Sequence, residues 1–143
     1  MPPNKNSCLL LLLLIGMVSC ADGNSLADKY EIHYKLQAKT GDNSDQIIIA
    51  AKSLTQVHYD VVITSVGVND VTKLSSPAKW IKKQNVLYSI IEKQFSPKMI
   101  IISGVPPLNL FPALPNPSAW LFGQYSQKMN YLLDQFAQDK AKY

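Results

Sequence analysis

Apolar and polar residues follow two different periods along this chain, and the periods separate strands from helices. Residues 61–66 form an almost continuous β-branched run, which is typical of a strand buried on both faces of a parallel sheet. Residues 32–41 instead alternate between apolar and polar types and end in glycine, as a half-buried strand entering a tight turn does. Strands are therefore predicted at about 31–39 and 60–67.

Three other segments, one between these strands and two after them, repeat their apolar residues every three to four positions. This spacing predicts helices at about 43–55, 77–95 and 117–139. Their expected core faces are, in chain order, Ile47, Ile48, Ala51 and Leu54; Trp80, Ile81, Leu87, Ile90, Ile91 and Phe95; and Trp120, Leu121, Met129, Leu132, Leu133 and Phe136. The second helix turns Lys79, Lys82, Lys83 and Lys93 to solvent. Strands that alternate with helices of this length predict an α/β fold with a parallel sheet and right-handed crossovers.

The chemistry of the chain concentrates where the strand at 60–67 ends. There Gly67-Val68-Asn69-Asp70 follows directly, and ligands of parallel sheets collect at the carboxyl ends of the strands. The side-chain amide of Asn69 is a donor of the kind that stabilises an oxyanion. Asp70 is expected to support the turn by accepting backbone N–H groups.

This strand and turn resemble block III, Gly-x-Asn-Asp, of the SGNH (GDSL-type) esterase and lipase family. The glycine that closes the preceding strand, Gly41, is similar to the lone glycine of block II, whose N–H group is a second oxyanion donor in that family. Ser96–Pro107 resembles the family's next strand and the loop that leaves it. The resemblance implies a flavodoxin-like three-layer sandwich, incomplete here, with three or four parallel strands over a domain at 25–143, and an ester substrate.

The resemblance does not extend to the family's catalytic triad. The sequence contains no Asp-x-x-His block, and its two histidines are His33 and His58. Ser44 is better explained as a helix-capping residue beside Asp42 and Asn43. Ser19, in a Gly-x-x-Ser order, lacks the acidic partner of the nucleophile block. A serine without a neighbouring base is a weak nucleophile at neutral pH.

The apolar run 9–18 has two interpretations. In the first, residues 1–20 are a secretory leader, and Met17-Val18-Ser19-Cys20 resembles a lipoprotein box whose Cys20 tethers the chain to a membrane. The protein would then be secreted or held at the cell envelope. In the second, residues 9–15 are the first, central strand of the family's sheet, and the protein would be cytoplasmic.

The segment 105–117 carries five prolines around Leu108, Leu110, Phe111 and Leu114, so regular structure is not expected there. Loops of this length are often functional. In one interpretation Leu108 and Phe111 form a wall of the substrate cleft. In the other they simply pack over the sheet.

The composition of the chain limits the kinds of ligand and partner that it is expected to bind. The chain of 143 residues is one domain, and its 14 basic residues are all lysines. The net charge of +4 is spread rather than clustered, which argues against nucleic-acid binding. Cys8 and Cys20 flank the apolar run and are not expected to pair. No spacing of His, Cys and Asp predicts a metal site, and no cofactor is expected.

Two hypotheses for the function follow. The chain is a partial SGNH-type ester hydrolase that retains the oxyanion donors Gly41 and Asn69 but lacks activity by itself. Alternatively, it is a non-catalytic, membrane-tethered module whose cleft still binds an acyl or glycan ligand. Both give it a small-molecule ester or acyl ligand.

Overall fold

A four-stranded parallel sheet in the order β2-β1-β3-β4 organises the fold of this computed structural model. The structure describes residues 9–14, 33–37 and 39–140. The strands are β1 (Leu9–Leu14), β2 (His33–Gln37), β3 (Val61–Ser65) and β4 (Met99–Ser103). The parallel α/β fold and the strand count predicted from the sequence are confirmed.

Strand β1 lies between β2 and β3 and pairs with both. Leu11, for example, is in register with Lys35 of β2 on one side and with Val62 of β3 on the other. The interpretation of the apolar run as a central strand requires this pairing. The lipoprotein-box residues 17–20 lie outside the described part of the chain.

The helices match the apolar periodicity closely. They are α2 (Ser44–Ser53), the short α3 (Val68–Thr72), α4 (Pro77–Phe95) and α5 (Ser118–Gln138), with a 3-10 turn, η1, at Leu108–Leu110. Helix α3 and the 3-10 turn were not predicted. Each has fewer than six residues, so neither completes two turns of apolar repeat that a sequence pattern could reveal.

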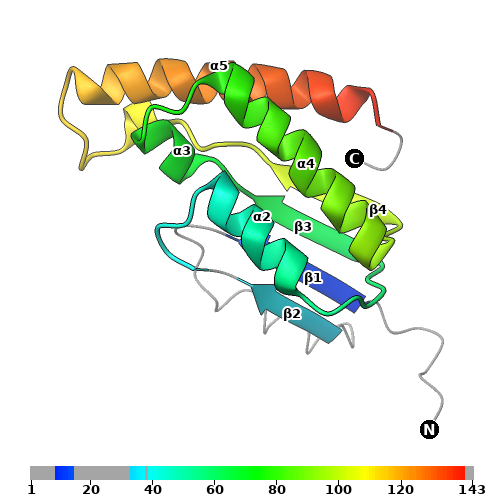
Figure 1. The fold of residues 1–143 in the computed structure, drawn as a ribbon. Helices are drawn as coiled ribbons and strands as arrows, with labels where there is room; N and C mark the ends of the chain where they lie inside the picture. Colours follow the sequence, from blue (N-terminus) through cyan, green and yellow to red (C-terminus); the bar gives the residue numbers. More distant parts are fainter. Residues whose placement is uncertain (1–8, 15–32, 38, 141–143) are drawn as a thin grey trace, which may run out of the picture.

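One apolar core joins α2, α4 and α5 to a single face of the sheet (Figure 1). Its members include Ile47 and Ala51 of α2, Val62 of β3, Ile100 of β4, Leu87, Ile91 and Phe95 of α4, and Met129, Leu133 and Phe136 of α5. The hydroxyls of Thr64 in β3 and Tyr88 in α4 lie 2.7 Å apart inside this core. The sheet thus contributes side chains to this core from alternate positions along a strand, such as Val62 and Thr64 of β3, because successive side chains of a strand point to opposite faces.

The first turn of α5 corrects the expected core face. Trp120 is 63% exposed and Leu121 is also exposed, whereas Ala119, Gly123 and Ser126 are buried. Close packing against η1 selects small residues here, because a Cβ at Gly123 would lie 2.7 Å from Cβ of Asn109. The prediction of Trp120 and Leu121 as core residues was therefore wrong.

Candidate active site

The carboxyl ends of the strands carry a tight connection from β3 to α3. Gly67 makes this connection with φ of 136°, a conformation that residues with a Cβ rarely adopt. A Cβ at this position would lie 2.5 Å from Cγ2 of Val105 and 3.2 Å from Cζ2 of Trp80. Glycine is thus required twice over, and the connection places Asn69 and Asp70 in the first turn of α3.

The amide of Asn69 lies against the loop that follows β2. Its Nδ2 donates to the main-chain oxygen of Asp42 at 2.8 Å. Gly41, the residue before, has φ of 89° and is exposed. Asn69 and Asp42, 27 positions apart in sequence, thus meet at one edge of the sheet. A carboxamide carries two N–H groups, and the bond to Asp42 uses one of them.

Asp70 joins the amino end of α2 to α3. Its Oδ2 accepts the main-chain N–H of Ser44 at 3.0 Å and the Ser44 hydroxyl at 2.9 Å. That hydroxyl in turn accepts from Nε2 of Gln84 in α4 at 3.0 Å. Asp70, Ser44 and Gln84 are all buried. The contacts of the Asp70 carboxylate therefore extend to α2, farther than the support of its own turn that the sequence suggested.

Burial is the main influence on the charge of Asp70. Desolvation raises the pKa of this carboxyl, while the two hydrogen bonds from Ser44 act in the opposite direction. Its Oδ1 has no hydrogen-bond partner among the described residues, and the same holds for Nε1 of Trp80. The carboxylate is thus a positioning group for the loop beside Asn69 rather than an exposed acid.

The described residues offer no nucleophile and base at this edge. Ser44 is fully buried, and its hydroxyl is used by Asp70 and Gln84, which agrees with its rejection as a nucleophile. Ser19 lies outside the described residues. His33 begins β2, and His58 precedes β3 with its Nε2 3.7 Å from Oδ1 of Asp60. Both histidines of the chain are therefore at the amino ends of parallel strands, opposite Asn69.

The proline-rich loop is held by α5. Asn130 accepts from the N–H of Val105 at 2.7 Å and donates to its carbonyl at 2.8 Å. Leu108 is only 2% exposed and belongs to the core, so its side chain does not face an open cleft. Phe111 is half-buried against the same core. Its contribution to a ligand cleft stays a prediction.

Sequence reasoning missed the link between Ser44, Asp70 and Gln84. One signal was available: Gln84 falls on the buried stripe of α4 between Trp80 and Leu87. A polar residue on such a stripe needs a hydrogen-bond partner. The described residues contain no group of three or more His, Cys, Asp or Glu side chains that could hold a metal ion.

Solved structures that superpose on this chain include lipases and esterases. A GDSL-like lipase of Parabacteroides merdae superposes with a TM-score of 0.71 at 14% identity, over 93% of this chain and 76% of its own. An extracellular lipase of Streptomyces rimosus gives 0.62 at 13% identity over 94% and 77%. An acetylxylan esterase of Geobacillus stearothermophilus gives 0.60 at 13% over 92% and 73%.

These similarities establish the fold of the chain as that of the SGNH hydrolases. No protein-family model and no curated protein matches the sequence. None of the helices in the described ranges is both long and apolar enough to cross a membrane.

Proposed function

We propose that Gly41 and Asn69 form the carbonyl-binding half of an SGNH-type ester hydrolase site. In this proposal the chain by itself binds a small ester or acyl ligand there and does not hydrolyse it. The supporting observation is the 2.8 Å bond from Asn69 to the main chain of Asp42, which sets a carboxamide donor beside Gly41. Donors preorganised at one edge stabilise developing negative charge on a carbonyl oxygen.

The positions of the histidines support the second half of the proposal. General-base catalysis requires the base within hydrogen-bond reach of the nucleophile, directly or through one water. His33 and His58 lie at the amino ends of β2 and β3, and Asn69 follows the carboxyl end of β3. We therefore expect p-nitrophenyl acetate to be hydrolysed no faster with the purified chain than in buffer. Hydrolysis that disappears in Asn69→Ala would contradict the proposal.

Binding at the two donors can be observed directly. In ¹H–¹⁵N spectra, butyrate should shift the main-chain amide of Gly41 and the side-chain amide of Asn69. Asn69→Ala should weaken butyrate binding about tenfold, the equivalent of one hydrogen bond. Asn85→Ala is the matched control, because the Asn85 amide also donates to a main-chain oxygen, that of Ile81, but on the exposed surface of α4.

The butyrate titration can contradict the proposed carbonyl-binding role of Gly41 and Asn69. Shifts confined to residues far from the edge, or equal binding by Asn69→Ala and wild type, would rule out the carbonyl-binding half. Phe111→Ala tests the alternative of a non-catalytic module with an acyl cleft. A loss of butyrate affinity in that variant, without loss of stability, would extend the site to the half-buried Phe111.

We also propose that residues 9–14 stay in the mature protein, because β1 lies between β2 and β3 and pairs with both strands. A chain that keeps them has no free amino terminus at Cys20 to receive a lipid. Mass spectrometry of the protein from its native host should then find residues 9–14. Deleting residues 1–20 should abolish the native circular dichroism spectrum, while deleting 1–8 should preserve it. A folded, cooperative protein after deletion of 1–20 would favour the leader and an extracytoplasmic address.

A further inference from the structure

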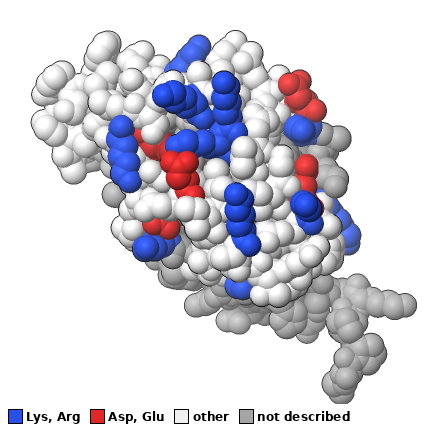
Figure 2. All heavy atoms as spheres, viewed as in Figure 1, with Lys and Arg blue, Asp and Glu red and all other residues white. Residues whose placement is uncertain are grey.

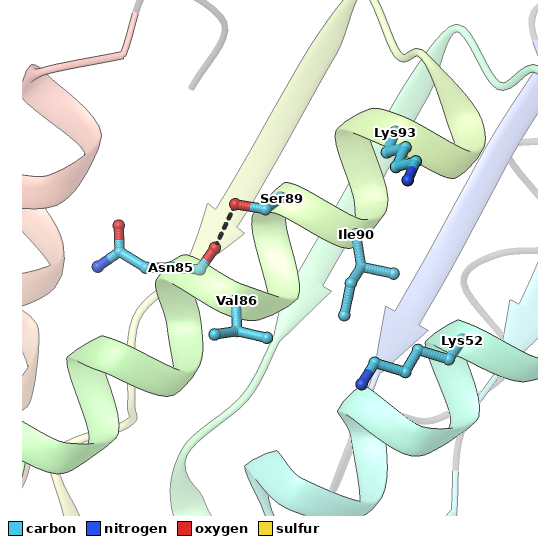
Figure 3. A pocket seen from close by; sticks show the side chains of 6 residues that line it. All are labelled: Lys52, Asn85, Val86, Ser89, Ile90 and Lys93. Atoms are coloured by element: carbon cyan, nitrogen blue, oxygen red, sulfur yellow. Dashed lines mark hydrogen bonds between the residues drawn. The ribbon is translucent and has the colours of Figure 1, made fainter.

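A groove separates the carboxyl-terminal half of α2 from α4, away from the proposed ligand site. Its volume is about 380 Å³, and its lining residues are Lys52, Asn85, Val86, Ser89, Ile90 and Lys93. In Figure 3, Val86 and Ile90 project from α4 on the side of α2, with Lys93 farther along α4 and Lys52 extending from α2. A second hollow of about 280 Å³ shares Lys52, Ile90 and Lys93 and continues to Gln56 and Gln94.

Val86, Ser89, Ile90 and Lys93, which line this groove, belong to a longer stripe on α4. Positions 79, 82, 83, 86, 89, 90 and 93 recur at intervals of three and four, so they share one face of the helix. Lysines occupy both ends of the stripe, and Val86, 48% exposed, stands at its centre. Ile49, three residues before Lys52 in α2, is 66% exposed. The face thus combines aliphatic side chains at the surface with flexible cations.

The charge of this face is positive. The two helices carry five lysines, Lys52, Lys79, Lys82, Lys83 and Lys93, against the carboxylates Asp45 and Glu92. Asp45 is paired with Lys83 at 2.6 Å. Figure 2 shows the lysine side chains spread across this side of the molecule. A face of this kind is complementary to an extended, negatively charged surface.

We propose that the α2–α4 face binds the surface of a bilayer that contains anionic lipids. The lysines would lie at the lipid headgroups, and Val86 and Ile49 would enter the interface, as the apolar side of an interfacial helix does. An acidic protein fits less well, because the cores of protein interfaces are rich in aromatic residues and arginine. The exposed aromatic residues Trp120 and Tyr131 lie on α5 instead, and the chain has no arginine.

Vesicle co-sedimentation tests this proposal on the full chain, with Cys20→Ser present in every variant so that no lipid can be attached there. Vesicles containing phosphatidylglycerol should bind the protein, and vesicles of phosphatidylcholine alone should not. Loss of two lysine charges in Lys52→Gln/Lys93→Gln should weaken binding by roughly 30-fold. Higher salt should also weaken it, because the Debye length shortens to about 3 Å at 1 M.

Two further variants separate a membrane surface from charge alone. Lys128→Gln/Lys140→Gln removes the same charge from α5 and its carboxyl end and should change binding by no more than about twofold if the α2–α4 face is responsible. Val86→Asn keeps the charge but removes an aliphatic contact, and it should weaken vesicle binding without affecting binding to soluble poly-glutamate. Equal losses in both lysine pairs, or no effect of Val86→Asn, would overturn the proposal. Thermal unfolding of each variant verifies that it is folded.

Discussion

Gly67→Ala is expected to destabilise the protein by about 3–5 kcal/mol, because two separate costs add at this position. The first is steric: the new Cβ would lie 2.5 Å from Val105 Cγ2 and 3.2 Å from Trp80. The second is conformational, since φ of 136° is accessible almost only to glycine. Urea unfolding of wild type and variant measures the loss of free energy.

Gly41→Ala provides the matched control for this experiment. Its φ of 89° is also positive, but nothing lies within 4 Å of a Cβ built there. This variant therefore carries the conformational cost alone, about 1–2 kcal/mol. If both variants lost the same unfolding free energy, the steric cost that we assign to Val105 and Trp80 at Gly67 would be contradicted.

Asp70→Ala is expected to cost about 3 kcal/mol of unfolding free energy at neutral pH. The substitution leaves the N–H and the hydroxyl of buried Ser44 without their acceptor, and each unsatisfied buried group costs about 1–3 kcal/mol. Removal of a desolvated carboxylate offsets part of this loss. Asp45→Ala is the control: Asp45 is exposed and pairs with Lys83 at the surface, so its loss should cost less than about 1 kcal/mol.

The same carboxyl should give the stability a characteristic pH dependence. Burial raises the pKa of Asp70 in the folded state above its ordinary value of 3.8, so the folded protein holds this proton to higher pH than the unfolded chain. Its favourable contribution is complete below 3.8 and is lost as the pH rises through the folded pKa. Asp70→Asn removes this decrease. Chemical unfolding of both proteins from mildly acidic to neutral pH measures it.

If the unfolding free energy of wild type rose with pH relative to that of Asp70→Asn, this account would be contradicted. It would mean that the hydrogen bonds from Ser44 outweigh desolvation and lower the pKa of Asp70. Either result reports on the charge of a group that positions the loop beside Asn69, so it bears directly on how rigidly the proposed carbonyl-binding site is held.

The sequence by itself determined the class of the fold and the edge at which the candidate site lies. The β-branched run at 61–66 and the apolar stripe of α4 are local patterns whose periods reflect burial directly. Gly67, Asn69 and Asp70 follow the strand in the sequence, so their position at its carboxyl end required no knowledge of distant contacts. The same holds for Gly41, which closes the strand before α2.

Only the tertiary structure decided which distant groups meet. The bonds from Asn69 to Asp42, from Ser44 to Asp70 and from Gln84 to Ser44 join segments separated by 26–40 residues, and no local period encodes such pairs. Tertiary packing also left Trp120 exposed and buried Ala119 and Gly123, and the close approach of Asn109 in η1 leaves no room for a Cβ at Gly123. It placed β1 in the centre of the sheet as well. The hydrophobicity of that segment suited a leader equally well. The order of the strands depends on hydrogen bonds between segments that are far apart in the sequence, which the hydrophobicity of one segment does not reveal.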